Sequence, residues 1–248
     1  MKKQASRRQP QSAWWPLWWD WILRGALLAL VVGLFVTLFD YLADPNNLPI
    51  QQVKVEGKLP HLDEADLQRR IDPYVKAGFI RLDVKALQHE LSQEPWVSGV
   101  FIRRLWPDTV VVRIEEHQPL AHWGPHGLLS ERGVVFFPSQ VTLPDHLPYF
   151  NAPVGMEKKV LKTYNQMKNT LTPLPLTIQR LELSPRGAWI LALENHMVIQ
   201  LGRQDILRRL ERFVKAYDKI IHSHHDDVKT VDLRYPNGIA VQWAKALP

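Results

Sequence analysis

The chain has 248 residues, 46% of them hydrophobic, and no cysteine. It can therefore bury a core, whereas a disulfide framework and a thiol catalyst are excluded. The net charge of +6 is concentrated at the N-terminus. Residues 1–13 carry four basic residues and no acid, whereas from Asp44 onward 26 basic residues are offset by 23 acidic ones. Since the body of the chain is nearly balanced, we expect no nucleic-acid partner.

A candidate membrane segment follows the basic tail. Residues 25–39 carry no charge, and a helix over residues 16–43 would rise roughly 40 Å, enough to cross a bilayer. A buried core helix and a cleaved signal peptide are the alternatives. A core helix is seldom apolar on every side, and a signal peptide would need a small residue where Tyr41 stands. We therefore predict an uncleaved single-span anchor.

The basic tail also predicts the orientation of this anchor. By the positive-inside rule, residues 1–15 form a cytoplasmic tail and residues 44–248 lie outside, which in a bacterium is the periplasm. Aromatic side chains gather where the span begins, as in the aromatic belts of membrane proteins. We predict that the membrane-interface anchors are Trp14, Trp15, Trp18, Trp19, Trp21 and Arg24.

Residues 50–118 are predicted to form a small α+β unit after a polar linker at residues 44–49. Residues 50–57 read as a strand, and two amphipathic helices follow, the second with Asp83 as its N-cap. Two strands at residues 96–105 and 109–117 flank a turn that contains Pro107 and Asp108. The order is strand, helix, helix, strand, strand.

Residues 119–248 are predicted to form an antiparallel β-rich domain with flanking helices. A hairpin turns at residues 131–133, and three strands share residues 176–202. Helices are expected over residues 160–171 and 205–221, the second strongly amphipathic. The last two strands flank Asn237 and Gly238, a strong hairpin signal.

No pattern in the sequence indicates catalysis. Gly-x-Ser-x-Gly, His-Glu-x-x-His and phosphate-binding glycine loops are all missing. Glu115 and Glu116 would point to opposite faces of a strand, which is poor geometry for acid–base chemistry. The best metal candidate comprises His222, His224, His225, Asp226 and Asp227, which we interpret as a solvated loop. We expect no catalytic residue, metal, cofactor or small-molecule substrate.

The last predicted strand, residues 239–243, suggests an interaction surface. If it lies at the edge of its sheet, its unpaired backbone groups can take up a strand from another chain. The alternative is that one of the protein's own helices covers this edge. The sequence pattern alone does not decide between them.

Five stretches in order resemble the FtsQ/DivIB family of bacterial cell-division proteins. They are "IQQVKVEG", "PWVSGVFIRRLWPDTVVVRIEEHQPLAHW", "ERGVVF", "LGRQDILRRLERFVKAY" and "VDLRYPNGIAVQW". The resemblance covers nearly the whole chain. It implies a single span, a POTRA domain over residues 50–118 and a C-terminal β domain over residues 119–248.

The resemblance also implies a function without catalysis. Family members are scaffolds at the division septum that link early components with late ones such as FtsW and FtsI, and so help control septal peptidoglycan synthesis. They bind the FtsB–FtsL pair in the periplasm, and the β domain takes up a strand of FtsB. The alternatives are a POTRA-bearing transport or assembly component and a membrane-anchored periplasmic enzyme.

Carried over residue by residue, the resemblance implies a partner-binding site near the C-terminus. Pro236 and Asn237 depart from the family's usual acid–serine pair, which affects side-chain contacts at the turn rather than backbone pairing. Trp243 has a second possible role, closing the core of the β domain. The FtsB-facing residues are expected to be Arg203, Arg234, Tyr235, Gly238 and Trp243.

Overall fold

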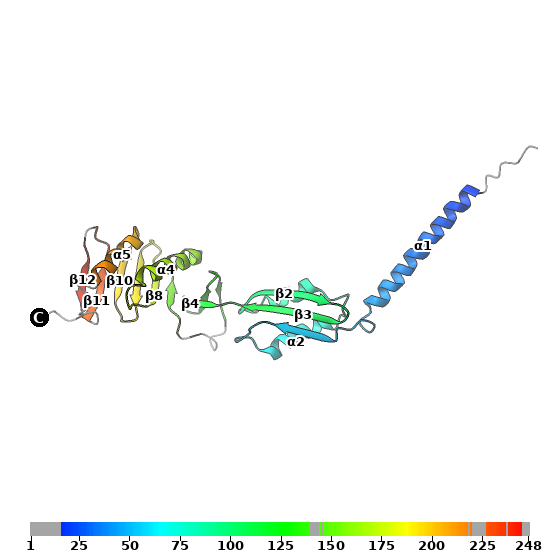
Figure 1. Cartoon of the computed structure of the whole chain (residues 1–248), viewed down its shortest axis with the longest axis horizontal. Coiled ribbons are helices and arrows are strands. Elements are labelled where there is room, and N and C mark those ends of the chain that lie inside the picture. Colours follow the sequence, from blue (N-terminus) through cyan, green and yellow to red (C-terminus); the bar gives the residue numbers. More distant parts are fainter. Residues whose placement is uncertain are drawn as a thin grey trace, which may run out of the picture. The chain divides into compact units, whose positions relative to one another are not determined.

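The structure is a computed structural model that describes residues 16–138, 144, 146–217, 219, 227–236 and 238–244. Figure 1 shows its helices and strands and labels many of them. The chain divides into two compact units. The first comprises residues 1–56, 65–88 and 102–112, and the second comprises residues 57–64, 89–101 and 113–248.

The N-terminal apolar segment forms one long helix, α1 (Pro16–Ala43). Within it, Trp18–Ala43 is the one stretch of the described chain that is long and apolar enough to cross a membrane. Trp18, Trp19 and Trp21 are exposed, as the predicted interface anchors require. The guanidinium of Arg24 lies 6.0 Å from the ring centroid of Trp21. Trp14 and Trp15 lie outside the described residues.

The predicted order of strand, helix, helix, strand, strand is confirmed. The elements are β1 (Gln52–Glu56), α2 (Glu64–Val75), α3 (Val84–Leu91), β2 (Val97–Leu105) and β3 (Thr109–Glu116). The sheet order is β1-β3-β2. As expected of an N-cap, the Asp83 carboxylate accepts a hydrogen bond from the backbone N–H of Ala86 (3.0 Å). In the first unit, α2, α3 and β3 supply the core residues Leu67, Ile71, Leu87, Val110 and Val112.

The second unit contains a nine-stranded sheet, of order β12-β11-β10-β9-β8-β7-β4-β5-β6 in the described chain. Helices α4 (Glu157–Leu171) and α5 (Ile206–Ala216) accompany it. Its strands are β4 (Pro119–Trp123), β5 (Gly127–Ser130), β6 (Val135–Phe136), β7 (Tyr149–Asn151), β8 (Ile178–Leu183), β9 (Trp189–Leu193), β10 (Val198–Gly202), β11 (Val228–Asp232) and β12 (Ala240–Trp243).

The predicted β-rich region with flanking helices is confirmed, but the sheet is mixed rather than wholly antiparallel. Among its described pairings, β4–β7, β7–β8 and β10–β11 are parallel. Two of these pairings follow from the helices, since α4 connects β7 to β8 and α5 connects β10 to β11. A strand, a helix and a second strand in sequence give parallel strands when the helix crosses over the sheet.

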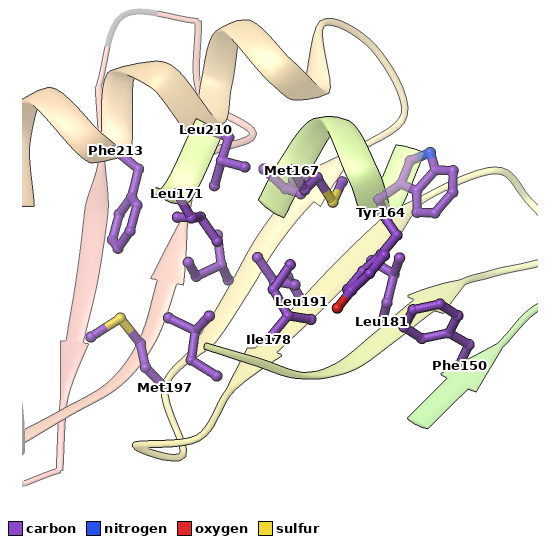
Figure 2. Packing of buried hydrophobic residues seen from close by; sticks show 14 of the residues in the cluster. Phe150, Tyr164, Met167, Leu171, Ile178, Leu181, Leu191, Met197, Leu210 and Phe213 are labelled. Carbon is purple, nitrogen blue, oxygen red and sulfur yellow. The ribbon is translucent and has the colours of Figure 1, made fainter. Parts of the chain in front are cut away.

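The core of the second unit lies between the two helices and one face of this sheet. Figure 2 shows Leu210 and Phe213 of α5 and Met167 and Leu171 of α4 directed toward side chains from the strands. Leu191 of β9 is fully buried in this cluster. The core therefore anchors α5 firmly, and α5 is the helix nearest in sequence to the predicted partner-binding residues.

Candidate protein-binding site

Parallel pairing brings the predicted cations to one end of the sheet. Arg203 directly follows β10, and Arg234 comes two residues after β11. These neighbouring strands run parallel, with Gln200 opposite Asp232, so their carboxyl ends meet. Tyr235 and Gly238 follow Arg234 in the loop that leads to β12. Four of the five predicted residues thus share one end of the sheet.

Trp243 lies at the other end of β12, where it pairs with Val228 at the start of β11. Its side chain is partly buried and packs against the core of the unit. Closure of the core, the second role considered for Trp243, is therefore observed. A partner strand that ran along β12 would pass from the Arg234 loop to Trp243.

Strand β12 is the terminal strand of the sheet within the described chain. The backbone N–H of Ala244 donates to the carbonyl of Asp227, the residue before β11. Because backbone groups alternate direction along an antiparallel strand, those of Gln242 and Ala240 also point toward β11. Those of Val241 point the other way, toward the side of β12 that bears no further strand in the described chain. This edge therefore offers the backbone donor and acceptor of Val241 for pairing with an added strand.

The loop before β12 is held by a residue that the sequence analysis did not single out. Arg212 of α5 donates to the carbonyls of Leu233 (3.0 Å), Tyr235 (2.9 Å) and Pro236. Three carbonyl groups in a short loop are thus tied to a helix that is anchored by Leu210 and Phe213. The loop that carries Arg234 and Tyr235 is thereby positioned in advance of any partner.

Arg234 is paired with Asp232 at the end of β11. Its Nη2 lies 2.7 Å from Oδ2, its Nε lies 3.0 Å from both carboxylate oxygens, and its backbone N–H donates to Oδ1 (2.9 Å). A guanidinium carries five N–H donors, so this pairing leaves Nη1 for another acceptor. The stem of Arg234 crosses Gly202, where an added Cβ would come within 3.2 Å of Cγ. Gly202 also has φ +76°, a conformation that favours glycine.

The Asp232–Arg234 pair makes a pH-dependent contribution to stability. Hydrogen bonding to the Arg234 side chain holds the pKa of Asp232 below its ordinary value of 3.8. Since the folded-state pKa is depressed, the stabilisation is fully present above that ordinary value and is lost as the pH falls through the folded-state pKa. We expect Arg234→Gln to raise the pKa of Asp232, as measured by carboxyl-carbon NMR titration. An unchanged pKa would show that the pair does not form in solution.

An open hollow of about 490 Å³ adjoins the loop. It is lined by Tyr235, Pro236, Gly238, Ile239 and Ala240. The side chain of Tyr235 is 57% exposed, and an added Cβ at Gly238 would meet nothing within 4 Å. A large exposed aromatic beside a hollow is typical of the centre of a protein–protein contact. Arg203 is also exposed.

The remaining candidates for chemistry do not form a site in the described chain. Glu115 meets Arg132 (3.3 Å) and Glu116 meets His61 (2.9 Å), so the two carboxylates have separate partners, as the strand geometry predicted. His222, His224, His225 and Asp226 lie outside the described residues. Within the described part, no cluster of three or more His, Asp or Glu residues is placed to hold a metal ion.

Comparison with known proteins identifies the family. Residues 48–117 match the family model "POTRA domain, FtsQ-type", and residues 121–234 match "Cell division protein FtsQ/DivIB, C-terminal". The chain is 36% identical over 218 residues to the cell division protein FtsQ of Coxiella burnetii, which covers 88% of each chain. It is 35% identical to that of Shewanella oneidensis, covering 92% of this chain and 88% of the relative. The protein therefore belongs to the FtsQ/DivIB family of cell division proteins.

Proposed function

We propose that this protein is a non-enzymatic, single-span scaffold of the division machinery that binds an FtsB–FtsL complex by taking up a strand of FtsB along β12. The observation that carries this proposal is the position of β12 as the terminal strand of the sheet in the described chain, where alternation directs the backbone groups of Val241 away from β11. Strand addition uses such groups for affinity and neighbouring side chains for specificity. The match of residues 121–234 to the FtsQ/DivIB C-terminal model favours this reading over a transport component.

The side chains around the edge support a partner with acidic groups. Arg203 is exposed and the Nη1 group of Arg234 is not used by Asp232. An arginine at an interface binds a carboxylate through paired N–H donors. Tyr235 supplies an aromatic anchor at one end of β12, and Trp243 flanks the other end. In this proposal Gly238 leaves room for the partner's backbone above the hollow.

The proposed topology follows from α1 and from the charge of the N-terminal tail. Residues 1–15 would lie in the cytoplasm, the helix over residues 16–43 would cross the inner membrane, and residues 44–49 would link it to a POTRA domain over residues 50–118. The β domain, residues 119–248, would then meet FtsB and FtsL in the periplasm at the septum. Scaffolding of FtsW and FtsI would follow from that assembly. No cofactor, metal or small-molecule substrate is part of this proposal.

Co-purification of the full chain with an FtsB–FtsL complex in detergent tests the proposal. We expect Tyr235→Ala to weaken binding by about tenfold or more, because exposed tyrosines at interface centres carry much of the binding energy. Trp243→Ala should also weaken it, together with some loss of thermal stability, since this side chain packs on the core.

Phe137→Ala is the matched control. Phe137 is an aromatic side chain that is 64% exposed, next to β6 at the opposite end of the sheet order. Its replacement should leave binding unchanged. If Tyr235→Ala and Trp243→Ala bind the complex as well as the unaltered chain does, the partner site lies elsewhere.

A further inference from the structure

The segment that follows α1, residues 44–51, is hydrogen-bonded to other parts of the first compact unit. The side-chain amide of Asn47 donates to the carbonyl of Tyr41 near the end of α1 (2.9 Å). The backbone N–H of Phe79 donates to the carbonyl of Leu48 (3.0 Å). The backbone N–H of Gln51 then donates to the carbonyl of Asp108 in the β2–β3 turn (2.9 Å).

These bonds place the β2–β3 turn close to the end of the candidate span. Even fully extended, the eight Cα–Cα steps from Ala43 to Gln51 would reach at most about 28 Å. The connection is shorter than that, because the chain turns at Asp44, whose carbonyl accepts hydrogen bonds from the backbone N–H groups of Asn47 and Leu48. Within the first unit, the turn therefore lies at the end where the chain enters the membrane.

An exposed apolar pair occupies this turn. The side chain of Trp106 is 78% exposed and that of Leu105 is 40% exposed. Of the charged residues beside the pair in the sequence, Arg103 meets Glu56 (3.7 Å), Arg104 donates to the carbonyl of Leu82 (2.6 Å), and Asp108 is acidic. Attraction to anionic lipid is therefore not the main property of this surface. An indole ring beside a membrane-entry point matches the preference of tryptophan for the bilayer–water interface.

We propose that Leu105 and Trp106 insert into the lipid headgroup layer at the end of α1 opposite to Trp18, Trp19 and Trp21. The binding partner of this surface is the bilayer itself. The contact would fix the orientation of the first unit relative to the membrane. It rests on α1 being a membrane span and does not depend on partner binding at β12.

Site-directed spin labelling of the full chain tests this contact, and the lack of native cysteine makes single labels unambiguous. Leu105→Cys carries the nitroxide in vesicles of phosphatidylethanolamine and phosphatidylglycerol. Collision with dissolved oxygen and with an aqueous nickel chelate reports its depth. Ala65→Cys is the exposed control, at the start of α2 and about 15 Å along the helix from its last residues. Leu34→Cys marks the middle of α1.

We expect the nickel collision rate at residue 105 to fall to about half or less of that at residue 65, as for a site in the headgroup layer. Trp106→Ala should raise the nickel collision rate at residue 105 most of the way to that at residue 65. If the label at residue 105 is as open to nickel as that at residue 65, the contact does not exist, and the exposed pair would serve a protein partner instead. A low nickel collision rate at residue 105 that persists in Trp106→Ala would also contradict the proposal. The closeness of the β2–β3 turn to the bilayer would then explain that rate without insertion of Trp106. A high nickel collision rate at residue 34 would show that α1 does not span the bilayer, and the inference rests on that span.

Discussion

Replacement of Val241 with proline is expected to leave the chain folded and to weaken FtsB–FtsL binding by at least about tenfold. Proline lacks the backbone N–H, and it is tolerated on an edge strand where that N–H faces away from the sheet. Val241 is such a position, because the N–H of Ala244 is directed to Asp227 and backbone groups alternate along β12. The ring of proline would also occupy the space needed by an added strand.

Val241→Thr is the matched control for this variant. Threonine keeps the β-branched shape and the backbone N–H, so it should retain binding, with a small loss of stability because Val241 packs partly on the core. Titration calorimetry with the purified complex and thermal unfolding of each variant separate the two effects. If Val241→Pro unfolds at the same temperature as Val241→Thr and binds equally well, no partner strand pairs with this edge.

Arg212→Ala is expected to lower the free energy of unfolding by about 2 kcal/mol and to weaken partner binding by about tenfold. Arg212 does not belong to the proposed contact surface, so its effect would come through the loop that it holds. Its loss leaves the carbonyls of Leu233, Tyr235 and Pro236 without the guanidinium. The partner would then have to order the loop on binding, which reduces affinity.

The positioning role of Arg212 can be distinguished from a general charge effect. Arg208→Ala removes the same charge from an exposed position on the same helix. It should change neither the free energy of unfolding nor the affinity for the partner. Arg212→Lys should recover only part of the binding, because the lysine ammonium cannot reproduce the planar set of N–H donors of the guanidinium. Faster amide hydrogen exchange at residues 233–236 in the free Arg212→Ala chain would report the loosened loop. Unchanged exchange there would contradict the positioning role.

The order of elements was predictable from the sequence because local patterns determine it. Alternating apolar residues predicted β3 and the β8–β10 strands, and Asp83 predicted the start of α3. Strands β4 and β7 were not predicted. They are short, at five and three residues, and short strands leave too few positions for a period to be recognised.

The arrangement of the candidate site was less predictable, because it depends on contacts between distant parts of the chain. The parallel pairing of β10 with β11 brings Arg203 to the same end of the sheet as Arg234, and it arises from the path of α5 over the sheet. Arg212 occurs in a helix with several other basic residues, and nothing in the sequence pattern marks it as different. Its contacts with residues 233–236 are 21 to 24 positions away.

Residue-resolved amide hydrogen exchange of the full chain, with and without the FtsB–FtsL complex, tests the strand-addition proposal most directly. We predict that the amide of Val241 exchanges more slowly in the complex, because it gains a hydrogen bond from the added strand. Those of Ala240 and Gln242 already point to β11 and should change little. Binding of the complex with no slowing at Val241 would contradict strand addition at β12.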